Sequence, residues 1–261
     1  MPLTPLCRCV VLALALCAAP ARAVGSAPNA LVALSADREN GQRSALLENR
    51  LAGPVSVRLW AEGNERNAIT LLLSALETRT VGRFEGQASL RLEAQPGAPL
   101  LLPPEQRLTY AFPLGRAQSW RVSQGFGGRE SHRSPGNWHA YDLSAPEGTP
   151  VLAARAGTVM QVVDEFAEGG TDARLKDRAN LIRVVHEDGS MALYAHLARG
   201  SARVALGTPV EAGTVLAAVG STGWSTAPHL HFSVQVNDGR ELLSLPFTLL
   251  GPDAVALPPG V

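Results

Sequence analysis

Cysteine is nearly absent from this chain of 261 residues. The three cysteines, Cys7, Cys9 and Cys17, all fall within the first 23 residues. We expect that segment to be removed on export, which leaves a mature chain without any thiol. Disulfides and thiolate metal sites are therefore excluded, and a metal would have to be held by histidine and carboxylate side chains.

The amino-terminal segment, residues 1–23, has the features of a cleaved signal peptide. Arg8 precedes an apolar run, residues 10–19, and Ala21-Arg22-Ala23 offers a small-x-small cleavage site. The run is too short to span a bilayer comfortably, and Leu16 precedes Cys17 where a lipoprotein signal needs a small residue. We predict a periplasmic or secreted protein with no stable membrane insertion after cleavage.

The chain also has no excess of positive or negative charge. Without the first 23 residues the chain has 21 basic and 23 acidic residues, and Lys176 is the only lysine. No basic run or patch stands out, so nucleic acid is not expected as a partner.

The first half, residues 24–112, contains short segments of strand character separated by turn residues. These segments recur at intervals typical of a β-sandwich, which predicts a small immunoglobulin-like accessory domain without visible chemistry. The segments are residues 31–34, 54–60, 68–73 and 88–93. Pro96, Pro99, Pro103 and Pro104 then predict a stiff connector that few contacts cross, with a domain boundary near residue 112.

The second half, residues 113–251, reads as an antiparallel β-domain followed by a short tail, residues 252–261. Valine-rich segments separated by glycines indicate its strands, and Glu187-Asp188-Gly189 is typical of a hairpin turn. The segments are residues 148–154, 157–163, 181–186, 190–197, 207–210 and 214–220.

The last of these segments leads into the stretch with the clearest chemistry, residues 227–236. Leu230, Phe232 and Val234 alternate with polar residues, which predicts a strand with His229 and His231 side by side on its polar face. Imidazoles two residues apart on a strand are aimed at one point and can bind a metal or accept protons. A pair of plain surface histidines is the alternative.

Two further polar side chains belong to this pattern. Asp142 lies on a strand whose Tyr141 and Leu143 face the core, and such an acid needs a cation as partner, either a metal or an arginine. Alternation over residues 190–197 places Tyr194 and His196 together on the polar face. His186, at a strand end, is expected to be a plain surface residue.

These stretches resemble the lysostaphin-like zinc metallopeptidases, also called LytM-type or M23 peptidases. The resemblance covers roughly residues 118–236 and rests on four motifs in the family's order. They are Tyr141-Asp142-Leu143-Ser144-Ala145-Pro146-Glu147-Gly148-Thr149-Pro150-Val151, Tyr194-Ala195-His196-Leu197, Val219-Gly220-Ser221-Thr222-Gly223 and Pro228-His229-Leu230-His231-Phe232.

The resemblance implies a role for each matching residue. Asp142 and His231 match zinc ligands, and His196 and His229 match the pair that handles the proton. We also expect Trp224, in the turn before the histidine strand, and Tyr194 to contact substrate. Family members mostly cleave peptides of bacterial peptidoglycan, so peptidoglycan peptides are the expected partner and Zn²⁺ the expected cofactor.

The third zinc ligand departs from the family pattern. The family usually has a histidine four residues before the acid, and here that position is Trp138. His139 is nearest, but its odd spacing from Asp142 puts the two side chains on opposite faces of an extended strand. His132 lies on a loop that Pro135-Gly136 can fold back, and its setting also resembles a branch of the family with a Ser-His further upstream. We predict His132 as the ligand and keep His139 as the alternative.

Two smaller departures lie beside the chemistry. Ala227 replaces a usual glycine and Ser233 a usual acid. We predict an exported zinc metalloendopeptidase acting on peptidoglycan cross-links or stem peptides. The alternative is a regulator of the same fold that has lost activity and binds and activates a separate wall amidase.

Overall fold

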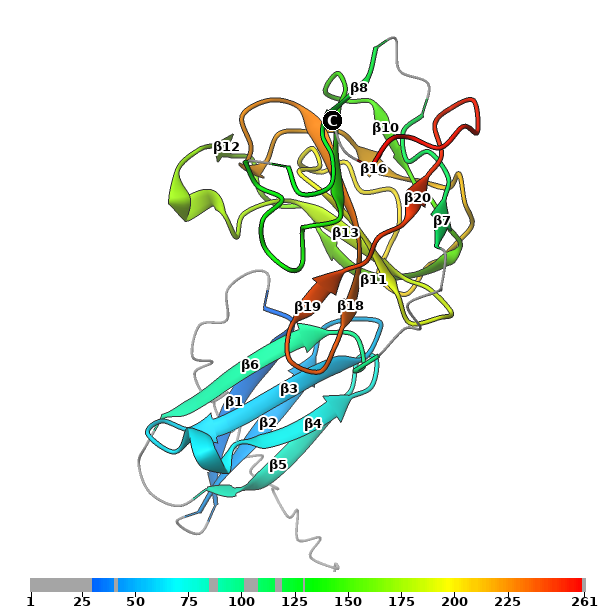
Figure 1. Ribbon diagram of the computed structural model, residues 1–261. Helices are drawn as coiled ribbons and strands as arrows, with labels where there is room; N and C mark the ends of the chain where they lie inside the picture. Colours follow the sequence, from blue (N-terminus) through cyan, green and yellow to red (C-terminus); the bar gives the residue numbers. More distant parts are fainter. Residues whose placement is uncertain are drawn as a thin grey trace, which may run out of the picture.

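The computed structural model describes residues 30–39, 42–84, 89–100, 108–115, 119–128 and 130–259. The predicted signal peptide and the three cysteines lie outside these ranges. Within them the protein is all-β, as predicted, with two single-turn 3-10 helices, η1 (Glu65–Asn67) and η2 (Ala173–Leu175). None of the described helices is long and apolar enough to cross a membrane. The chain forms two parts, with β1 to β6 in one and the later strands in the other (Figure 1).

The first part is a sandwich of two antiparallel sheets, with strand orders β1-β2-β5 and β4-β3-β6. Its strands are β1 (Val32–Glu39), β2 (Gln42–Asn49), β3 (Val55–Ala61), β4 (Ile69–Leu73), β5 (Thr78–Phe84) and β6 (Leu90–Pro96). Apolar side chains of both sheets, such as Leu47 and Leu59, share one core. The narrower immunoglobulin-like assignment stays a prediction, because the described residues form six strands in two sheets of three.

The second part is built on one eight-stranded sheet. Its main order is β15-β11-β13-β14-β18-β9-β8, and β19 pairs with β18. Within the described ranges, six further strands form the two-stranded sheets β10-β16, β12-β17 and β20-β7. In chain order the strands of this part are β7 (Thr109–Tyr110), β8 (Arg121–Gln124), β9 (Ala140–Ser144), β10 (Pro150–Leu152), β11 (Gly157–Val163), β12 (Gly169–Gly170), β13 (Leu181–Val185), β14 (Met191–Ala195), β15 (Pro209–Val210), β16 (Val215–Ala218), β17 (Gly223–Trp224), β18 (His229–Asn237), β19 (Leu242–Ser244) and β20 (Thr248–Leu249). Leu108 and Tyr110 already pack in this core, ahead of the predicted boundary near residue 112.

Strand β18 is central to this sheet, between β14 and β9. Leu230, Phe232 and Val234 are fully buried in the core on one side, which confirms the predicted alternation. The side chains in between face the other side of the sheet, where His231 lies opposite Asp142 on β9 and Ala195 on β14. The candidate site therefore rests on an interior strand of the sheet.

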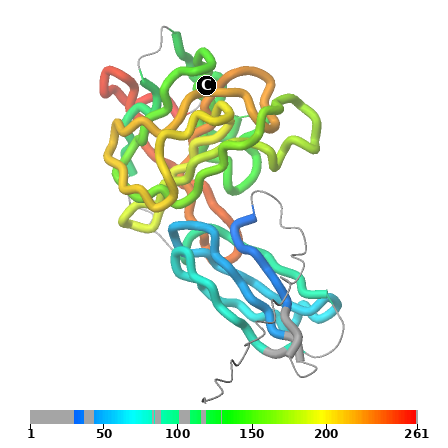
Figure 2. Tube along the Cα trace, turned by 180° about the vertical axis from the view of Figure 1, so that it is seen from behind, coloured from blue at the N-terminus to red at the C-terminus, as the bar shows by residue number. Residues whose placement is uncertain are grey.

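The two parts share packing, contrary to the prediction that few contacts would cross between them. Met160 and Met191 of the second part lie in the core of the first. The hairpin of β18 and β19 reaches into the first part in both views (Figures 1 and 2). At its tip the Asn237 amide donates to the Gly97 carbonyl and the Ser56 hydroxyl, each at 2.9 Å. The proline pattern of the connector carried no information about these contacts.

His186 is buried, with 4% of its surface exposed, so the prediction of a plain surface residue is wrong. Its Nδ1–H donates to the Ala156 carbonyl at 2.7 Å, and the ring meets Tyr110 edge-on at 5.4 Å. Nε2 is buried without a hydrogen-bond partner. Burial lowers the pKa of His186 below its usual value, so folding favours the neutral imidazole.

This burial predicts a loss of stability in mild acid. As the pH falls through about 6.5, the unfolded chain binds a proton at His186 more readily than the folded chain does, so the free energy of unfolding decreases. Replacing His186 with Gln should flatten this part of the stability profile, measured by denaturant unfolding between about pH 7 and 5. An unchanged slope in the variant would show that His186 does not titrate on unfolding.

Candidate metal centre and proton-transfer pair

Adjacent strands bring the first two candidate ligands together. Asp142 on β9 pairs directly with His231 on β18, and both side chains are almost buried, with 8% and 6% of their surface exposed. Nδ1 of His231 lies 2.9 Å from Oδ1 of Asp142.

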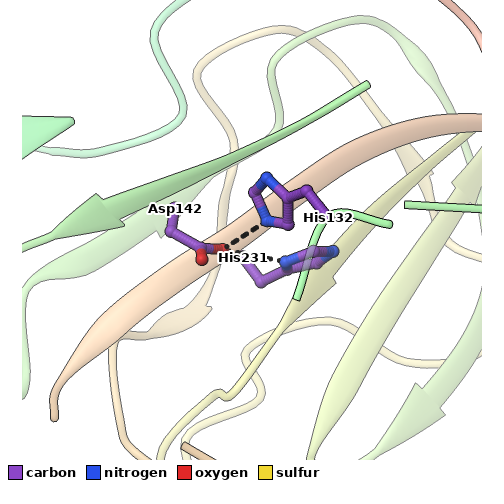
Figure 3. Close-up of side chains that lie close together, drawn as sticks. All are labelled: His132, Asp142 and His231. Carbon is purple, nitrogen blue, oxygen red and sulfur yellow. Dashed lines mark hydrogen bonds and ion pairs between the residues drawn. The ribbon is translucent and has the colours of Figure 1, made fainter. Parts of the chain in front are cut away.

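His132 arrives from the loop between β8 and β9. Its Nδ1–H donates to the Gly125 carbonyl at 2.7 Å, and its Nε2 lies 3.2 Å from the same Oδ1 of Asp142. Figure 3 shows the three side chains converging, with the carboxylate linked to both rings. One ligand atom from each residue lies within 4.8 Å of the others.

The donor set fits a metal ion such as zinc. Because a carbonyl can only accept, the bond to Gly125 places the proton of neutral His132 on Nδ1 and leaves a lone pair on Nε2. That nitrogen is buried, and Oδ1 of Asp142 lies 3.2 Å from it. The second oxygen of Asp142 accepts from the Gln124 amide at 2.8 Å, a contact that orients the carboxylate. Two imidazoles and one carboxylate make three protein ligands, as in catalytic zinc sites, where the fourth coordination position stays open for water or substrate.

The pKa values of this group make metal binding depend on pH. Burial alone would raise the pKa of Asp142, but hydrogen bonds from His132 and His231 outweigh burial and hold that pKa well below its usual range. Burial would lower the pKa of His132, and the bond to Asp142 outweighs it and raises that pKa. A metal must therefore displace protons from this group to bind, so its affinity should rise with pH.

His196 and His229 form a second pair next to the metal group. Their ring centroids are 4.6 Å apart, and the His196 ring lies 5.9 Å from that of His231. Nδ1–H of His196 donates to the Thr222 carbonyl at 2.7 Å, and Nδ1–H of His229 donates to the Ala227 carbonyl at 2.8 Å. Each bond fixes the neutral tautomer that leaves Nε2 free to accept a proton.

His196 reaches this position through an unusual backbone angle. Its φ is 64°, in the left-handed region that residues other than glycine rarely adopt. Tyr194 does not share its face, since the tyrosine is fully buried, packs on Phe232, and accepts from the Ala154 amide at 2.8 Å. The predicted substrate contact of Tyr194 is therefore wrong. Burial, and then the proximity of His229 and His231, lowers the pKa of His196 to about 3.

His139 lies away from the metal group. Its Nδ1 is 2.8 Å from the Ser244 carbonyl, and its ring meets Phe126 edge-on at 5.2 Å. The opposite orientation of His139 and Asp142 thus agrees with the spacing argument.

One groove of about 620 Å³ is lined by Asp142, His196, His229 and His231. Trp224 also lines it and is held there by an Nε1–H bond to the Thr171 carbonyl at 3.1 Å. The structure thus places Trp224, unlike Tyr194, at the groove.

Trp224 is predicted to form a wall against which substrate packs. Replacing it with Ala should raise KM by a larger factor than it lowers kcat. The melting temperature should change little, because the ring is half-buried and outside the core. Steady-state kinetics and thermal unfolding check this. If Trp224→Ala yields no soluble protein, the ring serves packing instead.

Sequence reasoning missed the residues that hold the site in place. Gln124 orients Asp142 and also donates to the Ser131 hydroxyl at 2.7 Å, beside His132. Thr222, whose carbonyl fixes His196, falls in one of the four family-like motifs, but nothing in its residue type indicates that role. Both contacts depend on distant parts of the chain.

Comparisons with known proteins agree with this geometry. The model of Peptidase family M23 matches residues 136–242. The range includes Asp142, His196, His229 and His231, whereas His132 lies just before it. The assignment of His132 as a ligand therefore draws its support from the structure.

Two curated relatives are similar over part of the second half. The DD-carboxypeptidase/endopeptidase Mpg of Neisseria meningitidis is 37% identical over 120 residues, which cover 45% of this chain and 25% of the relative. The cell division protein DipM of Caulobacter vibrioides is 34% identical over 94 residues, which cover 36% of this chain and 14% of the relative. The matched region thus spans a quarter or less of either relative.

A solved structure is also similar, the catalytic domain of a mutant of the prophage-encoded M23 protein EnpA from Enterococcus faecalis. It is 25% identical, with a TM-score of 0.38, and the match covers 52% of this chain and 94% of that one. On the strength of the motifs, the family match and the curated relatives, the chain carries a domain of peptidase family M23.

Proposed function

We propose that this protein is an exported zinc metalloendopeptidase that hydrolyses peptide bonds in peptidoglycan cross-links or stem peptides. One observation carries the proposal. His132, Asp142 and His231 converge as a candidate metal-binding group beside His196 and His229, which line the same groove with their Nδ1 atoms tied to carbonyls. A binding surface alone has no need for both sets.

A zinc ion on His132, Asp142 and His231 would polarise the scissile carbonyl and lower the pKa of a bound water to about 7. The protein's own residues then move the protons. His196 is neutral in the resting protein because its pKa is low, so its Nε2 accepts a hydrogen bond from the attacking water. His229 lines the same groove with its Nδ1 bonded to the Ala227 carbonyl, which leaves its Nε2 as a second acceptor for that water.

As water adds to the carbonyl carbon, one of these two Nε2 atoms takes its proton. The resulting imidazolium donates a hydrogen bond to the tetrahedral intermediate and then returns the proton to the leaving amine, which breaks the C–N bond. The Thr222 and Ala227 carbonyls hold the two rings in the tautomer this cycle requires.

The substrate class rests on the resemblance of the motifs and on the predicted signal peptide. An endopeptidase name among the relatives, that of Mpg from Neisseria meningitidis, supports a peptide-cleaving role. The name of DipM, a cell division protein, does not by itself separate an enzyme from a regulator.

Incubation of the purified protein with peptidoglycan, with and without a chelator, tests the proposal. We expect mass analysis to find peptides with new amino termini, and the chelator to prevent their release. An intact polymer, together with faster cleavage by an added wall amidase, would support the regulator instead.

A further inference from the structure

Arg183 is a buried cation that the proposed mechanism does not use. It lies on β13 with 6% of its surface exposed. It neighbours Leu193 in the sheet register, and Leu193 in turn neighbours Ser233 of the histidine strand. Among the described residues no carboxylate forms an ion pair with Arg183. Burying a guanidinium costs free energy unless it is hydrogen-bonded. The hydrogen bonds of Arg183 therefore indicate its role.

Its two hydrogen-bond acceptors are amide oxygens. Nη1 of Arg183 donates to Oε1 of Gln235 at 2.6 Å, and Nε donates to Oε1 of Gln161 at the longer distance of 3.5 Å. Gln235 is itself buried, with 4% exposed. A guanidinium can only donate, so Arg183 fixes which end of the Gln235 amide faces it.

The other end of that amide reaches the loop that carries His132. Nε2 of Gln235 donates to the Gly136 carbonyl at 2.7 Å. The backbone at Gly136 lies close to β19, since a Cβ there would come within 3.3 Å of the Leu242 carbonyl. Ser244 on β19 adds a second anchor, because its amide and its hydroxyl each donate to the Pro135 carbonyl at 2.8 Å.

We propose that Arg183 and Gln235 are positioning residues that hold His132 in place for the metal. Arg183 orients the Gln235 amide, the amide holds the loop at Gly136, and the loop presents Nε2 of His132 to Asp142. This inference rests on the proposed metal site. Metal binding then also requires Arg183 and Gln235, two residues of the same sheet outside the metal group.

Replacing Gln235 with Glu separates this role from general stability. A carboxylate still accepts from Arg183 but has no hydrogen to donate to the Gly136 carbonyl. Zinc affinity should fall about 10- to 100-fold, as for other contacts that support metal ligands. The metal-free protein should melt at the same or a higher temperature, because Arg183 gains a counter-ion. Competition titration with a chromophoric chelator, with zinc alone as probe, and thermal unfolding measure the two effects.

A matched pair at Arg183 keeps the inference testable if Gln235→Glu does not fold. Arg183→Met removes the donor that orients the amide and should weaken zinc binding, whereas Arg183→Lys keeps a donor and should recover part of the affinity. Gln161→Met removes only the contact away from the loop and should leave zinc affinity unchanged.

The inference is overturned if Gln235→Glu binds zinc as tightly as the wild type. It is also overturned if Gln161→Met weakens binding as much as Gln235→Glu, since burial of polar groups would then explain both. A wild-type protein that binds no zinc would instead contradict the proposed function.

Discussion

Alanine at His231 or Asp142 should remove bound zinc and activity together, whereas alanine at His196 or His229 should leave most of the zinc in place. Loss of either proton-handling imidazole should still lower kcat by roughly 10²-fold or more, the usual contribution of a general acid–base group. The physical reason lies in the contacts. His231 and Asp142 belong to the metal group, while Nδ1 of His196 and of His229 is tied to backbone carbonyls.

Metal analysis of the four purified variants, alongside their turnover of a peptidoglycan peptide, makes this comparison. Thermal unfolding of each variant without metal serves as the control for folding. Asp142→Ala should melt below the wild type, because it loses the hydrogen bonds to Gln124 and His231. Equal loss of zinc in all four variants would refute the division between ligands and proton carriers.

His132→Ala should release zinc, and His139→Ala should not. His132 is fully buried with its Nε2 3.2 Å from Asp142, while His139 points to Ser244 and Phe126. Removing a direct ligand should weaken binding by more than the 10- to 100-fold typical of a supporting contact. Zinc titration of both variants measures the difference.

The two histidines belong to the same connection between β8 and β9, so His139→Ala is a matched control for disturbance of this segment. If His139→Ala were the variant that releases the metal, the strand start at residue 140 would have to turn that side chain toward the groove when metal binds. The assignment of His132 would then be wrong.

The part of the site that could be predicted from sequence depends on local alternation. His231 and Asp142 lie on regular strands, where a period of two fixes the face of each side chain. The same rule oriented His139 away from Asp142. His132 required a different argument, the ability of a Pro-Gly pair to fold its loop back, and in the structure its Nε2 lies 3.2 Å from Oδ1 of Asp142.

Alternation failed where the backbone leaves the strand. His196 has a left-handed φ of 64°, so it enters the groove although Tyr194 faces the core. No residue type in that segment requires such an angle. The burial of His186 also could not be read from its position at a strand end, because its ring contacts Tyr110 and Ala156, which are distant in sequence.

The contacts between the two parts could not be predicted from the sequence either. Met160 and Met191 pack in the core of the first part, but the sequence does not indicate which of two cores a methionine in a strand will enter. Strands β2 and β5 were also missed, because β2 carries few of the β-branched and aromatic residues that indicate strands and β5 contains a glycine. Long-range packing decided these elements.

The zinc content of an untagged preparation tests the central claim most directly. The proposed site predicts about one zinc per chain, bound by three ligands with one position open, and loss of activity when the metal is removed. A protein that binds no zinc, yet still stimulates a wall amidase, would contradict the claim and identify the groove as a regulatory surface.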